Sequence, residues 1–230
     1  MVGHSFKIGY DLNMEKKNYS VCLLAAGKGS RTQLDYNKVF YKLSEEQTVL
    51  DKSIATFKAD ENCSQIILVC AAYEHEYVES LYGKDPQIVI VDGGTTRQGS
   101  VYNGLQQVTS EYVWIHDGAR PFLQKAHMDA LKEALEKEDA CLLMVPSTDT
   151  VKLVQDGYVV QTWDRSQVYR AQTPQCFKTA LIKQCHEMAK ADNRIATDDA
   201  QLVEWYSTTP IRVVEGDPGN IKITHPSDLK

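Results

Sequence analysis

The sequence has no long hydrophobic run: none of its apolar stretches approaches the ~20 residues that a membrane-spanning helix needs. Its first residues, MVGHSFKIGYDLN, lack the basic, apolar and small-residue blocks of a signal peptide. The six cysteines never occur in a CxxC or other metal-ligand spacing. The net charge of −6 provides no overall basic field for nucleic acid. We therefore expect a cytoplasmic, reduced protein that binds neither membranes nor nucleic acid.

The cysteines and the N-terminal residues give two further expectations. Cys22, Cys70 and Cys141 lie inside apolar runs, which predicts buried thiols. Residues 1–18 are interpreted as a flexible extension, with Met14 as an alternative start, and residues 19–230 as one domain.

Short apolar runs alternate with helix-like segments over the first two thirds of the chain. The helix-like segments carry apolar residues at steps of three and four, at 74–81, 100–107 and 125–137. The apolar runs lack strict alternation, as strands covered on both faces do. They are VCLLAA (21–26), QIILVCAA (65–72), QIVIVDGG (87–94), YVWIHDGA (112–119) and ACLLMVP (140–146). This order predicts an α/β fold, a Rossmann-like, mainly parallel sheet sandwiched by helices.

The alternation of strands and helices breaks after residue 146. Between Thr150 and Arg170, two alternating runs flank Asp156-Gly157, a turn signal that predicts a protruding β-hairpin arm at about 148–172. Helix-like segments follow at 178–190 and 198–205, then a strand-like run at 211–216. In the tail, Lys222 alternates with Ile221 and Ile223, which is typical of a strand.

A glycine-containing loop, AAGKGSR at residues 25–31, follows the first apolar run. Such a loop can present backbone N–H groups to phosphate oxygens. It fits neither the P-loop spacing nor the dinucleotide GxGxxG pattern, because residue 32 is threonine. Two nearby cations, Arg31 and Lys38, suit a triphosphate better than a single pyrophosphate. An ordinary strand-to-loop turn is the alternative interpretation.

An ordered series of motifs extends this interpretation over nearly the whole chain, from Ser20 to Leu229. The chain resembles the 2-C-methyl-D-erythritol 4-phosphate cytidylyltransferases, a family of nucleotidyltransferases. The matching motifs are AAGKGSR, NKVF, DGGTTRQGSV, HDGARPF, VPSTDTVK, DRSQVYRAQTPQCF, TDDAQLVE and NIKITHPSDL. The resemblance implies transfer of CMP from CTP to methylerythritol 4-phosphate, with release of pyrophosphate, in the non-mevalonate isoprenoid pathway.

Two alternatives stay open at this point. Ribitol-5-phosphate cytidylyltransferases share the reaction and the site, but tend to read AGG at residues 25–27 and to have a serine-led stretch at 197–200. The second alternative is a non-catalytic nucleotide-binding module. It is disfavoured because Arg31, Lys38 and Lys222 are all present.

The resemblance also assigns roles to individual residues. Arg31, Lys38 and Lys222 match the catalytic cations, and Asp117 matches an aspartate that holds Mg²⁺ or another divalent cation. The resemblance assigns CTP binding to Ala25, Ala26, Gly27, Gly29, Gly94, Thr95, Ser100, Asp117 and Gly118. It assigns binding of the acceptor to Asp117, Arg120, Thr150, Arg165, Thr173 and Thr197. In the family, two subunits exchange their arms, so the resemblance implies a homodimer in which Thr150 and Arg165 act in the partner's site.

Four nearby positions call for comment. Asn37 stands where many members have proline, which puts the preorganisation of the Lys38 loop in doubt. Thr95 replaces a frequent acidic residue, so a contact to cytosine or ribose is expected to be weaker. Arg97 is expected either to support the cytosine loop or to form a salt bridge at a helix start. His116 is expected to be a packed strand-end histidine.

Overall fold

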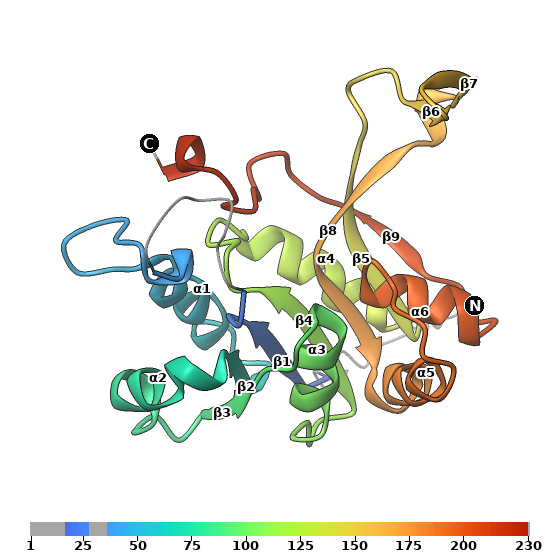
Figure 1. The fold of residues 1–230 in the computed structure, drawn as a ribbon. Coiled ribbons are helices and arrows are strands. Elements are labelled where there is room, and N and C mark those ends of the chain that lie inside the picture. Colours follow the sequence, from blue (N-terminus) through green and yellow to red (C-terminus); the bar gives the residue numbers. More distant parts are fainter. Residues whose placement is uncertain (1–16, 28–35, 230) are drawn as a thin grey trace, which may run out of the picture.

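A computed structural model describes residues 17–27 and 36–229, and it is built around one seven-stranded sheet (Figure 1). The strand order is β3-β2-β1-β4-β8-β5-β9, and within this sheet β8 runs antiparallel to both of its neighbours while the other described pairs are parallel. The strands are β1 (Tyr19–Leu24), β2 (Cys63–Cys70), β3 (Ile88–Asp92), β4 (Tyr112–Asp117), β5 (Ala140–Pro146), β8 (Tyr169–Lys178) and β9 (Arg212–Glu215). The mainly parallel α/β sheet expected from the sequence is confirmed.

Helices cover both faces of the sheet and bury two hydrophobic clusters against it. One cluster contains residues of α1 (Val49–Lys58), α2 (His75–Tyr82) and α4 (Lys125–Leu135). The other contains residues of α3 (Arg97–Leu105), α5 (Thr179–Ala191) and α6 (Asp199–Tyr206). Because both faces are covered, the parallel strands β1, β2, β4 and β5 are mainly apolar and mostly buried, as their sequences predict.

Three helices begin at polar caps that their sequences supply. Thr48 and Asp51 form a capping box at α1, Thr96 accepts from Gly99 N at α3, and Asp198 accepts from Gln201 N at α6. Two of these caps, at α3 and α6, fix helix starts that face the carboxyl end of the sheet, where the expected ligand site lies.

Three parts of the chain differ from the sequence analysis. Helix α1 was not predicted. Strand β8 was not predicted either, because the Gln172–Gln175 stretch of β8 is polar and contains proline. Pro174 lies where the pairing of β8 with both neighbours is interrupted, so no ladder bond is required of it. The strand-like interpretation of residues 221–224 is wrong: this tail forms no strand, although Ile223 is fully buried and its N–H donates to Ala119 O.

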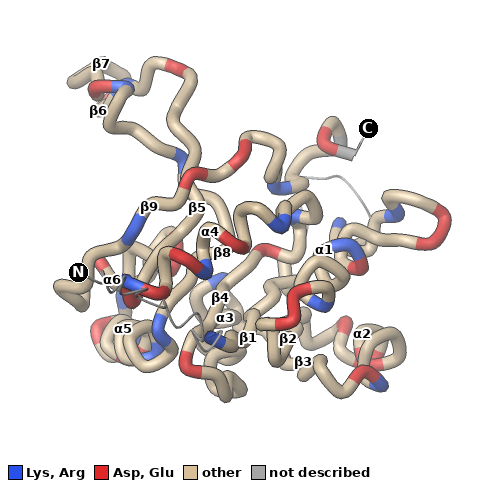
Figure 2. Tube along the Cα trace, turned by 180° about the vertical axis from the view of Figure 1, so that it is seen from behind, with Lys and Arg blue, Asp and Glu red and all other residues tan. Residues whose placement is uncertain are grey.

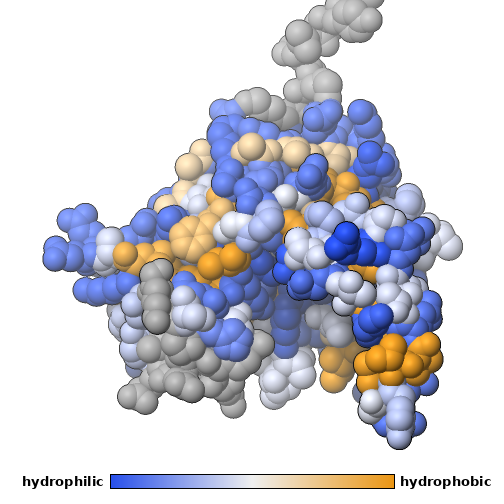
Figure 3. Space-filling model, turned by 90° about the horizontal axis from the view of Figure 1, so that it is seen from above, coloured by the Kyte–Doolittle hydropathy of each residue, from blue (hydrophilic) through white to orange (hydrophobic). Residues whose placement is uncertain are grey.

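The predicted arm is present and projects from the sheet (Figure 1). It contains β6 (Lys152–Gln155) and β7 (Tyr158–Thr162), joined by a turn in which Asp156 and Gly157 have positive φ, 49° and 83°. The space-filling view in Figure 3 shows hydrophobic side chains on the arm. The exposed ones are Leu153, Val154, Tyr158, Val159, Val160 and Trp163.

The remaining general expectations concern cysteines, membrane and charge. All six cysteines are free and buried, which confirms the expectation for Cys22, Cys70 and Cys141. No helix within the described ranges has the length and hydropathy of a bilayer span. In Figure 2, basic and acidic residues lie interspersed along the elements. Most of the expected N-terminal extension, residues 1–16, lies outside the described residues.

Candidate active site

The carboxyl ends of β1, β3 and β4 meet at one edge of the sheet, as parallel strands require. Gly118 N donates to Leu24 O at 2.8 Å, which joins the end of β4 to the end of β1. A Cβ at Gly93 would lie 2.7 Å from the Cβ of Ala26, so the loops after β1 and β3 touch. The structure therefore brings the three motif-bearing strand ends together, as the sequence predicted.

Asp117, the last residue of β4, is surrounded by three cations. Its Oδ2 lies 2.9 Å from Lys222 Nζ and 3.5 Å from Arg120 Nε, and its Oδ1 lies 3.7 Å from Arg97 Nε. Burial alone would raise the pKa of this carboxyl, but the charges of Lys222, Arg97 and Arg120 hold the pKa well below its usual range. Asp117 is therefore ionised at neutral pH, and its charge holds the cations at the strand ends.

Arg97 also links the Asp117 cluster to helix α6. Its Nη1 donates to Asp199 Oδ2 at 2.7 Å, and Asp199 Oδ1 lies 3.3 Å from His186 Nε2. Although burial opposes the charged form, Asp199 and Asp117 raise the pKa of Arg97. Of the two expectations for Arg97, the structure shows the salt bridge at a helix start, because Arg97 is the first residue of α3.

His116 is a packed histidine, as expected, and it orients the Asp117 backbone through Thr173. Its Nε2 lies 3.1 Å from Arg120 O, so Nε2–H donates and Nδ1 accepts from Thr173 Oγ1 at 3.0 Å. Thr173 Oγ1 in turn accepts from Asp117 N at 3.0 Å. Burial is the main reason that the pKa of His116 falls to about 4, which keeps the imidazole neutral.

The loop after β3 folds around Ser100. Ser100 Oγ accepts from Gly94 N at 3.1 Å and donates to Thr96 O at 3.0 Å. A Cβ at Gly94 would lie 2.7 Å from the carbonyl carbon of Gly99, so no larger residue fits there. Gly94 and Thr95 are exposed while Ser100 is buried, which leaves a polar edge of backbone open beside Ala26.

The loop after β1 is described only in part. Gly29 and Arg31, both predicted site residues, lie outside the described residues, whereas Ala25, Ala26 and Gly27 run from buried to exposed as the chain leaves β1. Lys38 is buried at the start of a short 3₁₀ helix, Lys38–Phe40.

Asn37 fixes the approach to Lys38, which the sequence analysis did not foresee. Its side-chain amide donates to Ala25 O at 2.7 Å and to Glu74 Oε2 at 3.0 Å. Its side-chain oxygen accepts from Val39 N at 3.3 Å. The loop is thus held by side-chain hydrogen bonds, at the position where the sequence analysis put its preorganisation in doubt. The available sequence signal was the preference of asparagine for caps.

The residues predicted for the acceptor are divided among three places: the Asp117 cluster, the segment before α6, and the arm. Asp117, Arg120 and Thr173 lie together, and Arg120 Nη1 donates to Asn220 O at 2.7 Å. Thr197 lies at the start of α6, where its N–H and hydroxyl donate to Gln201 Oε1.

The arm residues are not brought to this cluster by their own chain. Arg165 is exposed on the arm and donates to Thr148 O at 3.2 Å, and Thr150 is exposed beside it. Figure 1 shows the arm projecting beyond the sheet from β5 and β8.

Asn220 is a buried polar residue that the sequence analysis missed. Its amide donates to Thr173 O at 3.0 Å, while its carbonyl oxygen O accepts from Arg120. It therefore joins the tail carrying Lys222 to β8. The motif NIKIT contains this residue, but a lone asparagine carries little signal.

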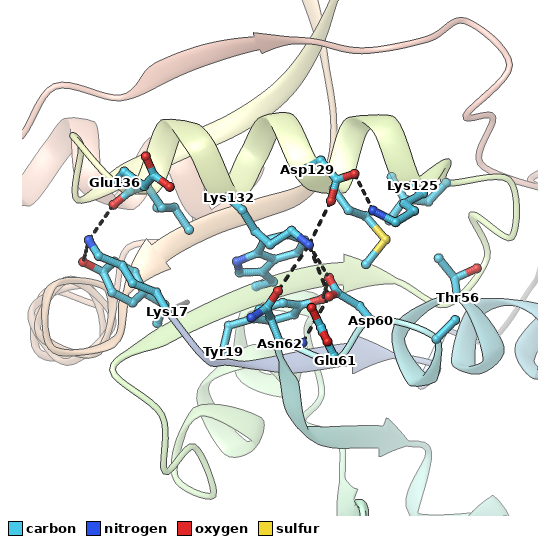
Figure 4. Close-up of a pocket in the computed structure, with 16 residues that line it drawn as sticks. Lys17, Tyr19, Thr56, Asp60, Glu61, Asn62, Lys125, Asp129, Lys132 and Glu136 are labelled. Atoms are coloured by element: carbon cyan, nitrogen blue, oxygen red, sulfur yellow. Dashed lines mark hydrogen bonds and ion pairs between the residues drawn. The ribbon is translucent and has the colours of Figure 1, made fainter. Parts of the chain in front are cut away.

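A cavity of about 730 Å³ lies elsewhere, between α1, α4 and the sheet (Figure 4). Figure 4 shows Lys132 reaching from α4 towards Asp129 and Asp60. The cavity is also lined by Tyr19 and Tyr112, the first residues of β1 and β4, so it lies at the opposite end of these strands from Asp117. None of the predicted site residues that the structure describes lines it.

The fold and the strand-end site define a class. An α/β sheet that gathers cations and loop backbone around one buried carboxylate at its strand ends is suited to bind a nucleotide and stabilise charge on its phosphates. The class is a nucleotide-dependent transferase of the α/β type.

Comparison with known proteins specifies the family. Residues 19–230 match the family described as 2-C-methyl-D-erythritol 4-phosphate cytidylyltransferase (IspD), and the chain belongs to it. The protein of that name from Geobacillus thermodenitrificans is 42% identical over 216 residues, covering 92% of this chain and 94% of its own. The resemblance found in the sequence is thereby confirmed, and the protein is a nucleotidyltransferase.

Solved structures agree with the sequence comparison. The 4-diphosphocytidyl-2C-methyl-D-erythritol synthase of Anaerococcus prevotii superposes with a TM-score of 0.82 at 34% identity, over 93% of each chain. The 2-C-methyl-D-erythritol 4-phosphate cytidylyltransferase of Francisella tularensis gives 0.79 at 32% identity, over 93% of this chain and 97% of its own.

Proposed function

We propose that this protein transfers CMP from CTP to 2-C-methyl-D-erythritol 4-phosphate and releases pyrophosphate, a step of non-mevalonate isoprenoid biosynthesis. The family to which it belongs carries this activity in its name. The observation that supports it best is the cluster of Lys222, Arg120 and Arg97 around Asp117, next to the loops that carry Ala26 and Gly94.

The chemistry requires alignment and charge neutralisation more than proton transfer. A phosphate oxygen of the acceptor attacks the α-phosphorus of CTP, and the bond to the bridging oxygen of pyrophosphate breaks. A phosphate monoester is already nucleophilic at neutral pH, so no strong general base is needed. Lys222 and Lys38 stabilise charge on the α-phosphate, because preorganised cations act most strongly where water is excluded. Arg31 is proposed for the same role.

The loop around Ser100 is proposed to recognise the cytosine of CTP. Backbone groups of Ala25, Ala26 and Gly94 form its edge, and the Ser100 hydroxyl fixes the position of Gly94 N at 3.1 Å. A pyrimidine can be read by such fixed donors and acceptors, since a mismatched base would leave buried polar groups unpaired.

The donor set at Asp117 fits a divalent cation. Mg²⁺ prefers oxygen ligands and is commonly held by one or two carboxylates with substrate phosphates and water. Asp117 is ionised, and its Oδ1 lies beyond hydrogen-bond distance of Arg97, at 3.7 Å. Asp117 would hold the ion together with phosphate oxygens, and the bound ion would supply additional positive charge to the triphosphate.

The acceptor site is proposed to be completed by a second copy of the chain. Within one chain Arg165 and Thr150 belong to the arm, where Arg165 donates to Thr148 O, while Arg120 and Thr173 contact Asp117. The exposed apolar side chains of the arm, from Leu153 to Trp163, suit burial against a partner. Arm exchange in a homodimer accounts for both observations.

The deciding measurement is pyrophosphate release with CTP and Mg²⁺, comparing methylerythritol 4-phosphate with ribitol 5-phosphate as acceptor. We expect release with the former and little with the latter, and loss of release when Mg²⁺ is chelated. A preference for ribitol 5-phosphate would retain the nucleotidyl transfer but reassign the acceptor. Release with neither acceptor would contradict the proposal.

A further inference from the structure

A second cluster of potential ligand atoms lies on the other side of the cytosine loop from Asp117. Cys70 and Asp92 are the last residues of β2 and β3 and are paired in the parallel ladder. His75 is the first residue of α2, and its Nδ1 lies 2.6 Å from Asp92 Oδ1. One ligand atom of each residue lies within 4.8 Å of the other two. Neither the family activity nor the predicted site uses these three side chains.

The spacing of the three atoms suits a small tetrahedral cation. Zn²⁺ binds Cys sulfur, His nitrogen and carboxylate oxygen at 2.0–2.3 Å, which places neighbouring ligand atoms roughly 3.5 Å apart. Rotations that move these atoms by about 1 Å would bring them to that spacing. Three protein ligands leave a fourth position for water. The mixture of sulfur, imidazole and carboxylate favours Zn²⁺ over the all-oxygen preference of Mg²⁺.

Burial and charge around the cluster also favour a cation. The side chains of His75 and Asp92 are 39% and 56% exposed, whereas Cys70 is fully buried beneath them. An ion can therefore enter from solvent and meet the sulfur at the base of the site. The carboxylates of Asp92 and Glu74 lie near Cys70, and their negative charge attracts a cation. Binding of the cation to the sulfur would release the thiol proton to solvent.

We propose that Cys70, His75 and Asp92 form a binding site for Zn²⁺ or a similar thiophilic divalent cation, separate from the Mg²⁺ of the reaction. The site is connected to the cytosine loop through the backbone. Cys70 O accepts from Gly93 N at 2.7 Å, and Asp92 immediately precedes Gly93. Asn103 of α3 holds Asp92 O at 3.0 Å. Occupancy draws Asp92 towards the sulfur and shifts Gly93 and Gly94, so it raises the KM for CTP. This consequence depends on the proposed role of that loop, whereas the binding site itself does not.

The binding experiment uses Co²⁺ with the full chain in the absence of CTP. A cobalt–thiolate bond gives a charge-transfer band in the near ultraviolet, which a site made of oxygen ligands does not give. We expect this band in the wild type and in Cys63→Ser, at the opposite end of β2, and its loss in Cys70→Ser. No band at saturating Co²⁺, or an equal band in Cys70→Ser, would overturn the proposal.

The two exposed ligands are tested by competition for Zn²⁺ against a chromophoric chelator. His75→Gln and Asp92→Asn should each weaken binding by more than the ~10–100-fold that loss of an outer-shell partner costs. Glu76→Gln, an exposed acid on the same helix, is the control and should bind as the wild type does. If the affinity for Zn²⁺ is unchanged in both variants, His75 and Asp92 form only a hydrogen bond with each other. That result would overturn the proposed binding site.

The link to CTP is measured by steady-state kinetics at saturating Mg²⁺, with and without Zn²⁺. The KM for CTP should rise in the wild type and stay constant in Cys70→Ser. An unchanged KM in wild-type protein shown to hold Zn²⁺ would refute the coupling. A protein inactive with every acceptor would contradict the proposed function, while the cobalt spectrum would still decide the binding site.

Discussion

At the scale of single residues, Asp117 organises the cluster by its charge. Three cations face one carboxylate, so in the proposed reaction they would already be in place before phosphate charge develops. His116 and Thr173 contribute differently, because they hold the Asp117 backbone and carry no charge at neutral pH. Charge at the site thus comes from a few residues whose placement depends on neutral ones.

Lys222→Ala should lower kcat by about 10²–10³-fold, the loss seen when one preorganised donor to a transition state is removed. The Lys222 side chain is 35% exposed but pairs with the buried Asp117 carboxylate, so the thermal midpoint should also fall, while Arg97 and Arg120 keep part of the pairing. Pyrophosphate release and a thermal melt measure the two effects. Lys125→Ala is the control, since Lys125 pairs on the surface with Asp129. A folded Lys222→Ala enzyme with near-normal turnover would remove this lysine from the mechanism.

His116 should make stability fall as pH is lowered. Its pKa is about 4 in the folded chain and 6.5 when unperturbed, so between these values the unfolded chain binds a proton that the folded chain does not. The contribution is fully present above pH 6.5 and decreases as pH falls towards 4. Between pH 7 and pH 5 the expected loss is about 2 kcal/mol.

Urea unfolding at a series of pH values measures this loss. His116→Asn removes the titrating group, so its free energy of unfolding should depend less on pH between 7 and 5 than that of the wild type. The paired carboxylates Asp51 and Asp199, whose pKa values are lowered, act mainly below this range. Parallel curves for the two proteins would contradict the assignment.

At the scale of elements, the sequence predicted strands best where both faces are buried. β5 matches its predicted range at both ends, and the other four apolar runs overlap β1 to β4. β8 was not predicted because its polar side chains do not form an apolar face. Gln172, Thr173 and Gln175 instead make hydrogen bonds to Asp217 O, Asp117 N and Asp199 N, respectively. Helix α1 carries a clear apolar face at Leu50, Ile54 and Phe57, so the sequence did contain its signal.

The candidate site was predicted in part for a related reason. Glycines and cations can be recognised in the motifs at the strand ends, and Asp117 and Arg120 lie close together because both belong to the end of β4 and the loop after it. Asn37 and Asn220 were missed because their roles depend on distant carbonyls, those of Ala25 and Thr173. Such partners are set by tertiary packing, which spacing along the chain does not show.

The loop before Lys38 gives a prediction at this scale. Asn37→Ala removes the donor to Ala25 O and should destabilise the fold by about 1–3 kcal/mol, as an unpaired buried acceptor does. Asn37→Pro loses the same bond, but the native φ of −65° and ψ of 124° suit proline. Its stiffer unfolded state should recover about 0.4–1 kcal/mol.

Urea unfolding of the two Asn37 variants provides the comparison, with CTP KM as a second readout of loop position. Asn37→Pro should be the more stable variant and the closer to wild type in KM. The opposite order would mean that the loop is held by the amide alone and that its backbone angles contribute little.

At the scale of the whole molecule, the layered sheet supplies one end where ligand groups meet, and the arm extends beyond it. The covered faces keep β1 and β4 in register, so that Leu24 pairs with Asp117. The arm has the opposite character, with exposed side chains along both β6 and β7. A sheet covered on both faces and an arm with exposed apolar side chains together favour assembly of the proposed dimer.

Arm exchange predicts complementation between two inactive variants. In a mixed dimer of Lys222→Ala and Arg165→Ala chains, one site combines an intact Lys222 with the partner's intact Arg165, and the other site lacks both. Random mixing should therefore restore about a quarter of wild-type activity. The measurement is pyrophosphate release after the two variants are unfolded together and refolded. Each variant refolded alone is the control. No recovery in a mixture that forms dimers would place both residues in the site of one chain.

The way the arm leaves the sheet has a consequence for how this protein can change. The arm departs after Pro146 and returns at Tyr169, and these two residues are themselves paired between β5 and β8. The pairing of β5 with β8 holds both ends of the arm together. The length and sequence of the arm can therefore vary at little cost to the stability of the sheet. Exchanging this one segment for that of a relative would then alter which chains recognise each other while leaving the catalytic end of the sheet intact. In the proposed dimer, the arm would thus be an exchangeable segment that determines which copies of the chain associate.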